Sequence, residues 1–161
     1  MRQPQHPRIR AVTVKNLLSE KPPESYSISI NATLHEALKT MSQHNIDGVA
    51  VLDGEHLAGT FSERDLARMA SSDSAFMADK PLSHAMTPAL DFVTPDQIAQ
   101  SCLALMLEKR LNLIPVMEHG KLIGLLSIVE LQQAIITQYE SIFQAYALDQ
   151  KILFLQGTYS C

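Results

Sequence analysis

The chain has 161 residues, 46% hydrophobic and 19% charged, so it can bury a core and is not disordered by composition. No apolar run approaches the ~20 residues that span a bilayer, and the N-terminal residues lack the apolar stretch of a secretory signal. Two cysteines cannot supply a disulfide framework, and a net charge of −4 argues against wholesale nucleic-acid binding. We therefore expect a cytoplasmic protein with no membrane and no nucleic-acid partner.

The N-terminal residues 1–11 are predicted to form a disordered basic tail. Residues 1–15 carry four basic side chains and no acid, namely Arg2, Arg8, Arg10 and Lys15. Such a segment is typical of a solvated chain end, and it also suits contact with an anionic partner.

An internal repeat is the most informative feature of the sequence. Residues 26–70 and 91–135 match at a constant offset of 65 without a gap. The matched positions include Leu38 with Leu103, Met41 with Met106, Val51 with Val116, Gly59 with Gly124, Ser62 with Ser127 and Asp65 with Glu130. Self-similarity at a fixed offset indicates two copies of one structural unit.

The first copy predicts the order β-α-β-β-α from its hydrophobic periodicity. Its elements are a strand at Tyr26 to Ile30, a helix with Leu34, Ala37, Leu38 and Met41 on its apolar face, strands Gly48 to Leu52 and Leu57 to Phe61 joined at Asp53-Gly54, and a helix from Glu63. The Asp-Gly pair between two apolar runs indicates a hairpin turn.

The second copy predicts the same order. Its elements are a strand at Leu90 to Val93, a helix opened by Pro95 and Asp96 with Ile98, Cys102, Leu105 and Met106 on its apolar face, strands Leu113 to Met117 and Lys121 to Leu126 joined at His119-Gly120, and a helix from Ile128. Proline and acidic residues favour the first turn of a helix. We expect Cys102 to be a buried thiol.

These patterns predict an α/β (α+β) fold of two pseudo-symmetric β-α-β-β-α repeats packed as one module. One unit alone leaves apolar helix faces uncovered, and two copies can bury them against each other. We expect repeat one at 12–70, a polar linker at 71–81, repeat two at 82–136, and a C-terminal helix and tail at 137–161. That helix is apolar on one side, which suits either packing onto the module or a dimer or partner surface.

Both copies close with the pattern G-x-x-S-x-x-[DE], and the first carries the letters SERD. The stretches NIDGVAVLDGEHLAGTFSERDLAR and LEKRLNLIPVMEHGKLIGLLSIVEL resemble the two repeats of stand-alone bacterial tandem CBS (cystathionine-β-synthase-type) proteins of the SERD-motif type. The resemblance covers roughly residues 12–159. It implies a non-catalytic regulatory module that binds an adenine nucleotide between the repeats, commonly dimerises, and signals to a partner protein.

The first candidate site is the corner at Ser62, Arg64 and Asp65. Ser62 is a good helix N-cap, and the free N–H groups and dipole of a helix start favour an anion such as phosphate. The Asp65 carboxylate suits the paired hydroxyls of a ribose, and the Arg64 guanidinium suits a phosphate. The same spacing is also a capping box, in which the acid folds back onto its own helix start.

The resemblance implies further ligand contacts in copy one. The adenine is expected against Ser27, Ile28, Asp47, Gly48 and Val49. Gly48 would allow a flat ring to approach the backbone closely, whereas plain core packing explains Ile28 and Val49 equally well.

A weaker second site is expected in copy two at Ser127, Glu130, Asn112, Ile114 and Pro115. Glu130 stands where the family usually has Asp, and its side chain is longer by one bond, about 1.5 Å. Glutamate is also the better capping-box residue. We expect this corner to be degenerate.

The sequence contains no P-loop, dinucleotide-binding or nucleophile-elbow motif, and its six histidines have no metal-ligand spacing. We therefore expect no catalytic residues and no metal. The expected ligand is AMP, with ATP, NADH or S-adenosylmethionine as alternatives, and the expected partners are a second copy and an unknown protein. The alternative is a structural dimerisation module whose nucleotide sites have decayed.

Overall fold

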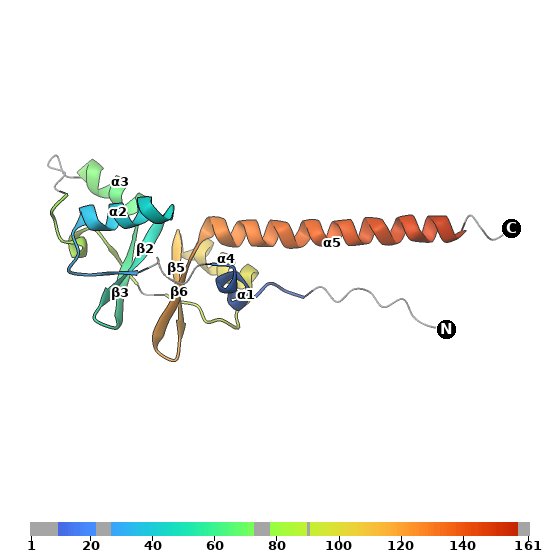
Figure 1. The fold of residues 1–161 in the computed structure, drawn as a ribbon, viewed down its shortest axis with the longest axis horizontal. Coiled ribbons are helices and arrows are strands. Elements are labelled where there is room, and N and C mark those ends of the chain that lie inside the picture. The colour runs from blue at the N-terminus through green and yellow to red at the C-terminus, as the bar shows by residue number, and fades with distance from the viewer. Residues whose placement is uncertain (1–9, 22–26, 73–77, 90, 158–161) are drawn as a thin grey trace.

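The computed structural model describes residues 10–21, 27–72, 78–89 and 91–157. Residues 1–9 of the predicted tail, part of the predicted linker, Tyr26, Leu90 and the last four residues lie outside this range. The described chain forms a body of two similar halves from which one long helix projects (Figure 1).

The first half contains the predicted β-α-β-β-α unit. Its elements are β1 (Ser27–Ser29), α2 (Leu34–His44), β2 (Gly48–Asp53), β3 (His56–Ser62) and α3 (Glu63–Ser72). A 3₁₀ turn, η1 (Leu82–His84), and β4 (Thr87–Pro88) follow, and the sheet order is β1-β2-β3-β4. Strand β1 runs parallel to β2, and the other two pairs are antiparallel.

The second half repeats this plan except for its first strand: among the described residues, the strand predicted at 90–93 is only an isolated bridge at Val93. Its elements are α4 (Ala99–Lys109), β5 (Leu113–Glu118), β6 (Lys121–Ser127) and α5 (Ile128–Gly157), preceded in the chain by α1 (Val14–Ser19). Val93 makes a parallel bridge to Val116, which corresponds at the offset of 65 to the pairing of Ile28 with Val51 in the first half. The two predicted hairpins are confirmed as β2–β3 and β5–β6.

One predicted helix start is wrong. Helix α4 begins at Ala99, whereas Pro95 and Asp96 were expected to open it. The Thr94 N–H donates to Gln97 Oε1 at 2.7 Å, and the Thr94 hydroxyl donates to Asp96 Oδ1 at 2.6 Å. These bonds hold residues 94–97 in a turn, and Ile98 then bridges to Thr13 before the helix starts.

The segment that precedes each repeat in the chain packs in the core of the other repeat. Val14 and Leu17 of α1 pack in the core of the second half with Val93, Met106 and Leu126. Conversely, residues of the segment after α3 pack in the core of the first half, namely Leu82 and Ala85. The repeat boundaries predicted at residues 12 and 82 follow chain order. In the structure, each core also contains residues from the start of the other predicted repeat.

A third, smaller cluster joins the halves. It contains Ala50 of β2, Leu113 of β5 and Leu125 of β6, with Leu57 and Leu122 packed against it. The two pseudo-symmetric repeats therefore form one module, as predicted.

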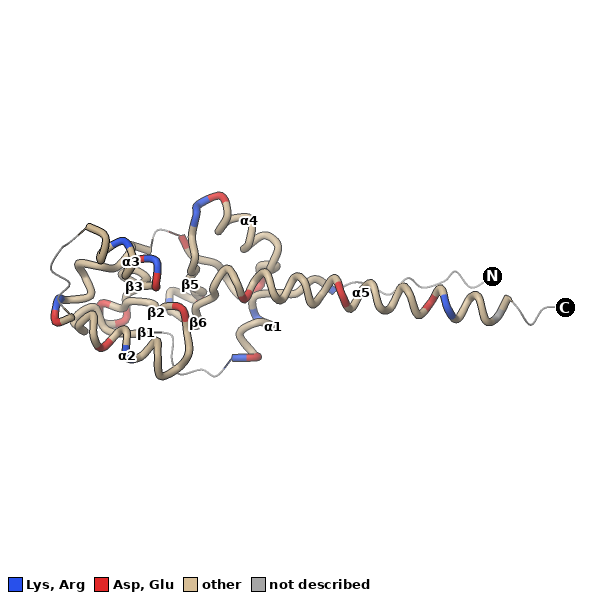
Figure 2. The backbone as a smooth tube through the Cα atoms, turned by 90° about the horizontal axis from the view of Figure 1, so that it is seen from above, with Lys and Arg blue, Asp and Glu red and all other residues tan. Residues whose placement is uncertain are grey.

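Helix α5 is much longer than the fold requires. Its 30 residues correspond to about 45 Å at 1.5 Å per residue. The closing helix of repeat two and the predicted C-terminal helix are one continuous element without a break near residue 137. Beyond the body α5 projects as a rod that carries few charged residues (Figures 1 and 2). Among the described residues, no helix is long and apolar enough to cross a membrane.

Candidate functional site

The Asp65 corner is filled by hydrogen bonds within the chain. Asp65 Oδ2 accepts from the Ser62 backbone N–H at 2.8 Å and from the Ser62 hydroxyl at 2.9 Å. Asp65 Oδ1 accepts from the Thr87 hydroxyl at 2.6 Å and from Arg68 Nη2 at 2.5 Å. Only 4% of Asp65 is exposed. Both carboxylate oxygens therefore have partners, and the acid is folded back onto the start of its own helix.

Arg64 lies at the same corner but points to the other half. Its Nη1 donates to the carbonyl oxygen of Arg110 at 2.9 Å. Arg110 is the left-handed C-cap of α4, whose last carbonyls have no partner within the helix. Arg64 thus ties α3 to α4 across the two repeats.

The Glu130 corner shares the bond from the serine N–H to the acid, but the serine hydroxyl accepts here instead of donating, and the surroundings differ. Glu130 Oε2 accepts from the Ser127 N–H at 2.7 Å, and the Glu130 N–H donates to Ser127 Oγ at 3.2 Å. Glu130 Oε1 forms an ion pair with Lys21, whose Nζ also donates to the Leu125 carbonyl at 2.8 Å. The Lys21 and Glu130 side chains are 32% and 38% exposed, so solvent reaches this corner.

An open cleft lies beside Glu130, between the two repeats. Its volume is about 510 Å³, which is within the usual range for small-molecule sites. Residues of both halves line it: Leu18, Lys21, His44, Asn45, Ile46, Asp47, Gly48, Leu113, Ile123, Gly124, Leu125, Ser127, Val129 and Glu130. The start of α5 therefore faces the end of α2 and the start of β2 across this space.

The structure groups the predicted site residues differently from the sequence. Gly48 is the ladder partner of Ser62, yet Asp47 and Gly48 line the cleft that contains Ser127 and Glu130. Asp47 and Gly48 were expected beside Asp65 because they belong to the same repeat.

Other predicted contacts lie on strands or in the cores. Ser27 and Ile28 lie on β1 beside β2. The side chains of Val49 and Ile114 are fully buried, so only their backbone could meet a ligand. Asn112 accepts the Ile128 N–H at 2.9 Å through its carbonyl oxygen, and Pro115 accepts the Val93 N–H in the same way. Neither Asn112 nor Pro115 is among the residues that line the cleft.

Lys21 and His44 are the ionisable residues of the cleft that sequence reasoning missed. Lys21 follows α1 and reaches the cleft only because α1 packs in the second half. At the offset of 65 its counterpart is Met86, so the repeat gives no signal for a cation there. His44 ends α2 and has no metal-ligand spacing, so no site was expected there.

The remaining chemistry of the described residues is limited. No group of three or more His, Cys, Asp or Glu side chains among them could hold a metal ion. Cys102 is buried, as predicted, and burial raises the pKa of its thiol. A protonated, buried thiol is a poor nucleophile.

Comparison with known proteins identifies the family. The profile described as "CBS domain" matches residues 14–72 and 82–137. An uncharacterized 17.7 kDa protein of Acidianus ambivalens is 32% identical over 113 residues, which are 69% of this chain and 67% of that protein. The chain also matches CBSCBSPB1 of Arabidopsis thaliana at 29% identity over 73% of its length, but it spans only 21% of that longer protein.

Solved structures show the same fold. A putative signal-transduction protein with CBS domains from Burkholderia ambifaria is 34% identical, with a TM-score of 0.69 over 78% of this chain and 95% of that one. Two more distant structures, each 21% identical, carry ligands: CBSX2 in complex with AMP (TM-score 0.65, covering 78% and 97%) and the MJ0100 CBS pair in complex with 5′-methylthioadenosine and S-adenosyl-L-methionine (0.68, covering 80% and 99%). With a family profile on both repeats and this fold, the chain belongs to the CBS-domain family as a tandem pair.

Proposed function

We propose that the protein is a non-catalytic regulatory module that binds an adenine nucleotide, AMP first among the candidates, in the cleft beside Glu130. The observation that carries the proposal is the open space of about 510 Å³ between the repeats, lined by a cation, a helix start and an acid. Binding would signal to a partner by favouring one arrangement of the two repeats, which requires unequal affinity for two conformations.

The chemistry of the cleft suits the parts of a nucleotide. Lys21 and the positive end of the α5 dipole favour a phosphate. A phosphate that pairs with Lys21 would release Glu130 Oε1 from its ion pair, and that acceptor then suits a ribose hydroxyl. Apolar side chains from both halves, Ile46 and Leu113 among them, offer faces for a flat base, and Gly48 keeps the backbone accessible.

Relatives with adenine-containing ligands support the ligand class. The structures of CBSX2 with AMP and of the MJ0100 pair with methylthioadenosine and S-adenosylmethionine share this fold. The Ser62–Asp65 corner stays part of the proposal as a second position, and opening it requires breaking the bonds that now fill the carboxylate. The SERD-type assignment rests on residues 62–65, and we propose it together with a cytoplasmic, homodimeric protein.

Isothermal titration calorimetry with AMP tests the proposal. We expect wild type to bind, and we expect Lys21→Ala and Glu130→Gln each to weaken binding about tenfold or more, the loss of roughly one charged hydrogen bond. Glu36→Gln is the matched control, because Glu36 caps Thr33 of α2 as Glu130 caps Ser127 but lies outside the cleft.

Each result has a definite meaning. No binding of AMP, ATP, NADH or S-adenosylmethionine at millimolar concentration would remove the proposed function. Binding that survives both cleft substitutions but not Asp65→Asn would move the ligand to the other corner.

A structural module with decayed sites is the second candidate. The saturated carboxylate of Asp65 favours it, because a site that binds by that acid is closed in this arrangement. Native mass spectrometry that finds no retained nucleotide, together with a tight dimer, would support this candidate over the first.

A further inference from the structure

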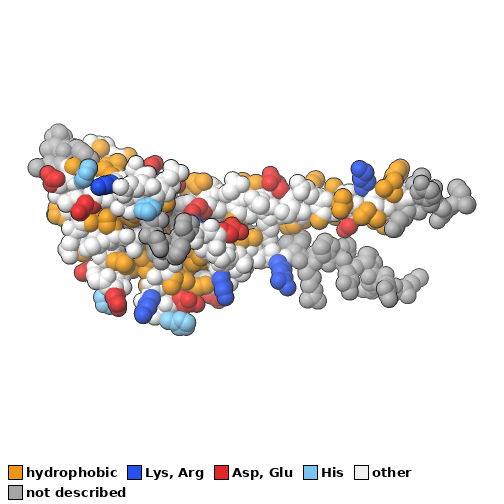
Figure 3. All heavy atoms as spheres, in the orientation of Figure 1, with side chains coloured by type: hydrophobic (Ala, Val, Ile, Leu, Met, Phe, Trp, Pro, Cys, Tyr) orange, Lys and Arg blue, Asp and Glu red, His pale blue; other side chains and the backbone are white. Residues whose placement is uncertain are grey.

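Helix α5 exposes more apolar surface than a monomer usually does. From residue 136 onward, nine of its large hydrophobic side chains are exposed: Ile136, Tyr139, Phe143, Tyr146, Leu148, Ile152, Leu153, Phe154 and Leu155. At roughly 100 Å² each they present about 900 Å², whereas the largest apolar patch of a monomer is typically about 300–600 Å². Part of this surface, including Tyr146, Ile152 and Leu153, lines the groove described next, and the rest, including Phe143, lies elsewhere around the helix. Figure 3 shows hydrophobic side chains along the projecting rod.

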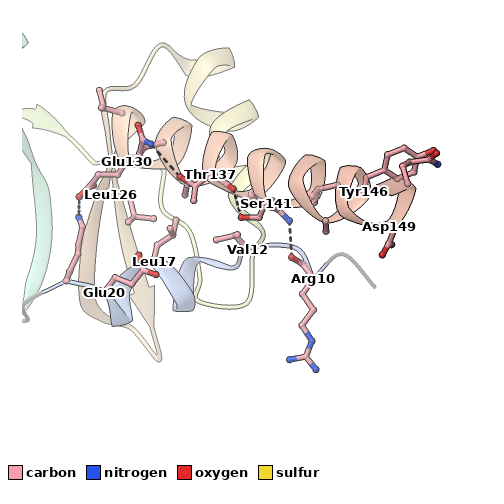
Figure 4. Close-up of a pocket in the computed structure, with 18 of the residues that line it drawn as sticks. Arg10, Val12, Leu17, Glu20, Leu126, Glu130, Thr137, Ser141, Tyr146 and Asp149 are labelled. Atoms are coloured by element: carbon pink, nitrogen blue, oxygen red, sulfur yellow. Dashed lines mark hydrogen bonds and ion pairs between the residues drawn. The ribbon is translucent and has the colours of Figure 1, made fainter. Parts of the chain in front are cut away.

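A long groove runs along one side of the same helix. It lies between α5 and the segment of residues 10–21, and its volume is about 1460 Å³. Thr137 and Ser141 line it from α5, and Val12 and Leu17 line it from the other side (Figure 4). A helix with side chains is about 10–12 Å across, so this volume corresponds to roughly 10–12 helical residues.

Side-chain size changes along the α5 face that contains the groove. Near the body this face carries the small residues Ala134, Thr137 and Ser141. Towards the tip, helical spacing continues it with large apolar residues, namely Leu148, Ile152 and Leu155. Large side chains pack best opposite small ones. The tip of one α5 is thus complementary to the base of another that runs in the opposite direction.

We infer that the groove holds the tip of α5 from a second copy, packed antiparallel about a two-fold axis. Placing that axis between Gln144 and Ala145 sets Leu155 opposite Ala134, Ile152 opposite Thr137 and Leu148 opposite Ser141, all with one register. Residues 145–155 then fill the groove, a length that matches its volume. The contact is the same for both copies, as a two-fold interface requires.

Charges at the groove agree with this register. Arg10 lies at its edge, where its carbonyl oxygen accepts from Gln138 Nε2 at 2.9 Å. In the antiparallel register, Asp149 of the second copy is level with residue 140, about 3 Å along the axis from Gln138. Asp149 of the second copy therefore lies at about the same position along the α5 axis as the exposed Arg10.

The inference rests on the proposed homodimer and gives it a surface, without involving the nucleotide. Light scattering of the full chain without ligand tests it, so its failure is distinct from a failure to bind AMP. We expect a dimer for wild type and a dissociation constant raised about 100-fold or more by Ile152→Glu, because a buried unpaired charge disrupts an apolar interface. Phe143→Glu is the matched control, since Phe143 is 80% exposed on the side of α5 away from the groove.

Further variants test the groove and the charge pair. Thr137→Arg should weaken the dimer from the groove side, and Asp149→Arg should weaken it in a way that Arg10→Asp partly restores. Circular dichroism should show unchanged helix content in each variant. A monomeric wild type, or a dimer that Phe143→Glu breaks and Ile152→Glu leaves intact, would overturn the inference.

A distance measurement tests the direction of packing. A nitroxide on Gln132→Cys, in a Cys161→Ser background with the buried Cys102 retained, reports the separation of the two copies by pulsed electron spin resonance. The antiparallel register separates the two positions by about 25 residues of rise, so we expect about 40 Å. A distance below about 20 Å would mean parallel helices and would refute the pairing.

Discussion

Replacing Asp65 by alanine separates a structural acid from a ligand-binding one. The buried carboxylate accepts from the Ser62 N–H, the Ser62 hydroxyl and the Thr87 hydroxyl, and its bond from Arg68 adds little because that side chain is 59% exposed. Hydrogen bonds to a charged group contribute about 1.5–3 kcal/mol each, but hydroxyls can turn to water or other acceptors. The loss of an N-terminal cap costs about 1 kcal/mol.

Together these terms predict that Asp65→Ala lowers the free energy of unfolding by about 3 kcal/mol. Urea denaturation followed by circular dichroism measures the change, with Glu130→Ala as comparison. We expect a loss of about 1 kcal/mol for Glu130→Ala, because its corner is solvated. A loss below about 1 kcal/mol for Asp65→Ala, combined with abolished AMP binding, would refute the reasoning and return Asp65 to the role of ribose ligand.

Three further predictions follow from single contacts. Gly48→Ala should destabilise the fold by about 1–3 kcal/mol in urea unfolding, because a Cβ there would lie 2.3 Å from Leu113 Cδ1 and 2.6 Å from the Phe61 carbonyl oxygen; Gly157→Ala, with no atom within 4 Å, should not destabilise it. Cys102 should react with iodoacetamide at pH 7 only after unfolding, since burial raises the pKa of its thiol and keeps it protonated; rapid labelling of native protein would contradict this. A double-mutant cycle on Lys21 and Glu130 should give under about 1 kcal/mol, falling with added salt, because both groups are about one-third exposed.

Local sequence patterns predicted most of the secondary structure. The offset of 65 predicted two β-α-β-β-α units, and the turns at Gly54 and Gly120 formed hairpins because both glycines adopt a positive φ. The start of α4 was misplaced because Pro95 and Asp96 are equally suited to a turn. The repeat and the hairpin turns depend on residues that are close together in the chain, so they can be predicted from the sequence.

The difference in burial between the Asp65 and Glu130 corners could not be predicted from the sequence. Asp65 and Glu130 occupy matched positions with the same capping pattern, and their difference arises from Thr87 and Lys21, which come from distant segments. Sequence reasoning expected the shorter acid to be the open one, whereas Asp65 is buried and Glu130 faces the cleft. The packing of the two halves determines which of the two carboxylates is accessible to solvent.

Because α1 packs in the second half and the η1 segment packs in the first, each half completes the core of the other. A protease cut within residues 73–77 would leave fragments that each hold a piece of the other's interior: Val14 and Leu17 on one, Leu82 and Ala85 on the other. Neither fragment could complete its hydrophobic interior alone, and the pair mixed in solution should reassemble. The unit that folds, and that can be lifted intact into a larger polypeptide, is therefore the pair and never the single repeat.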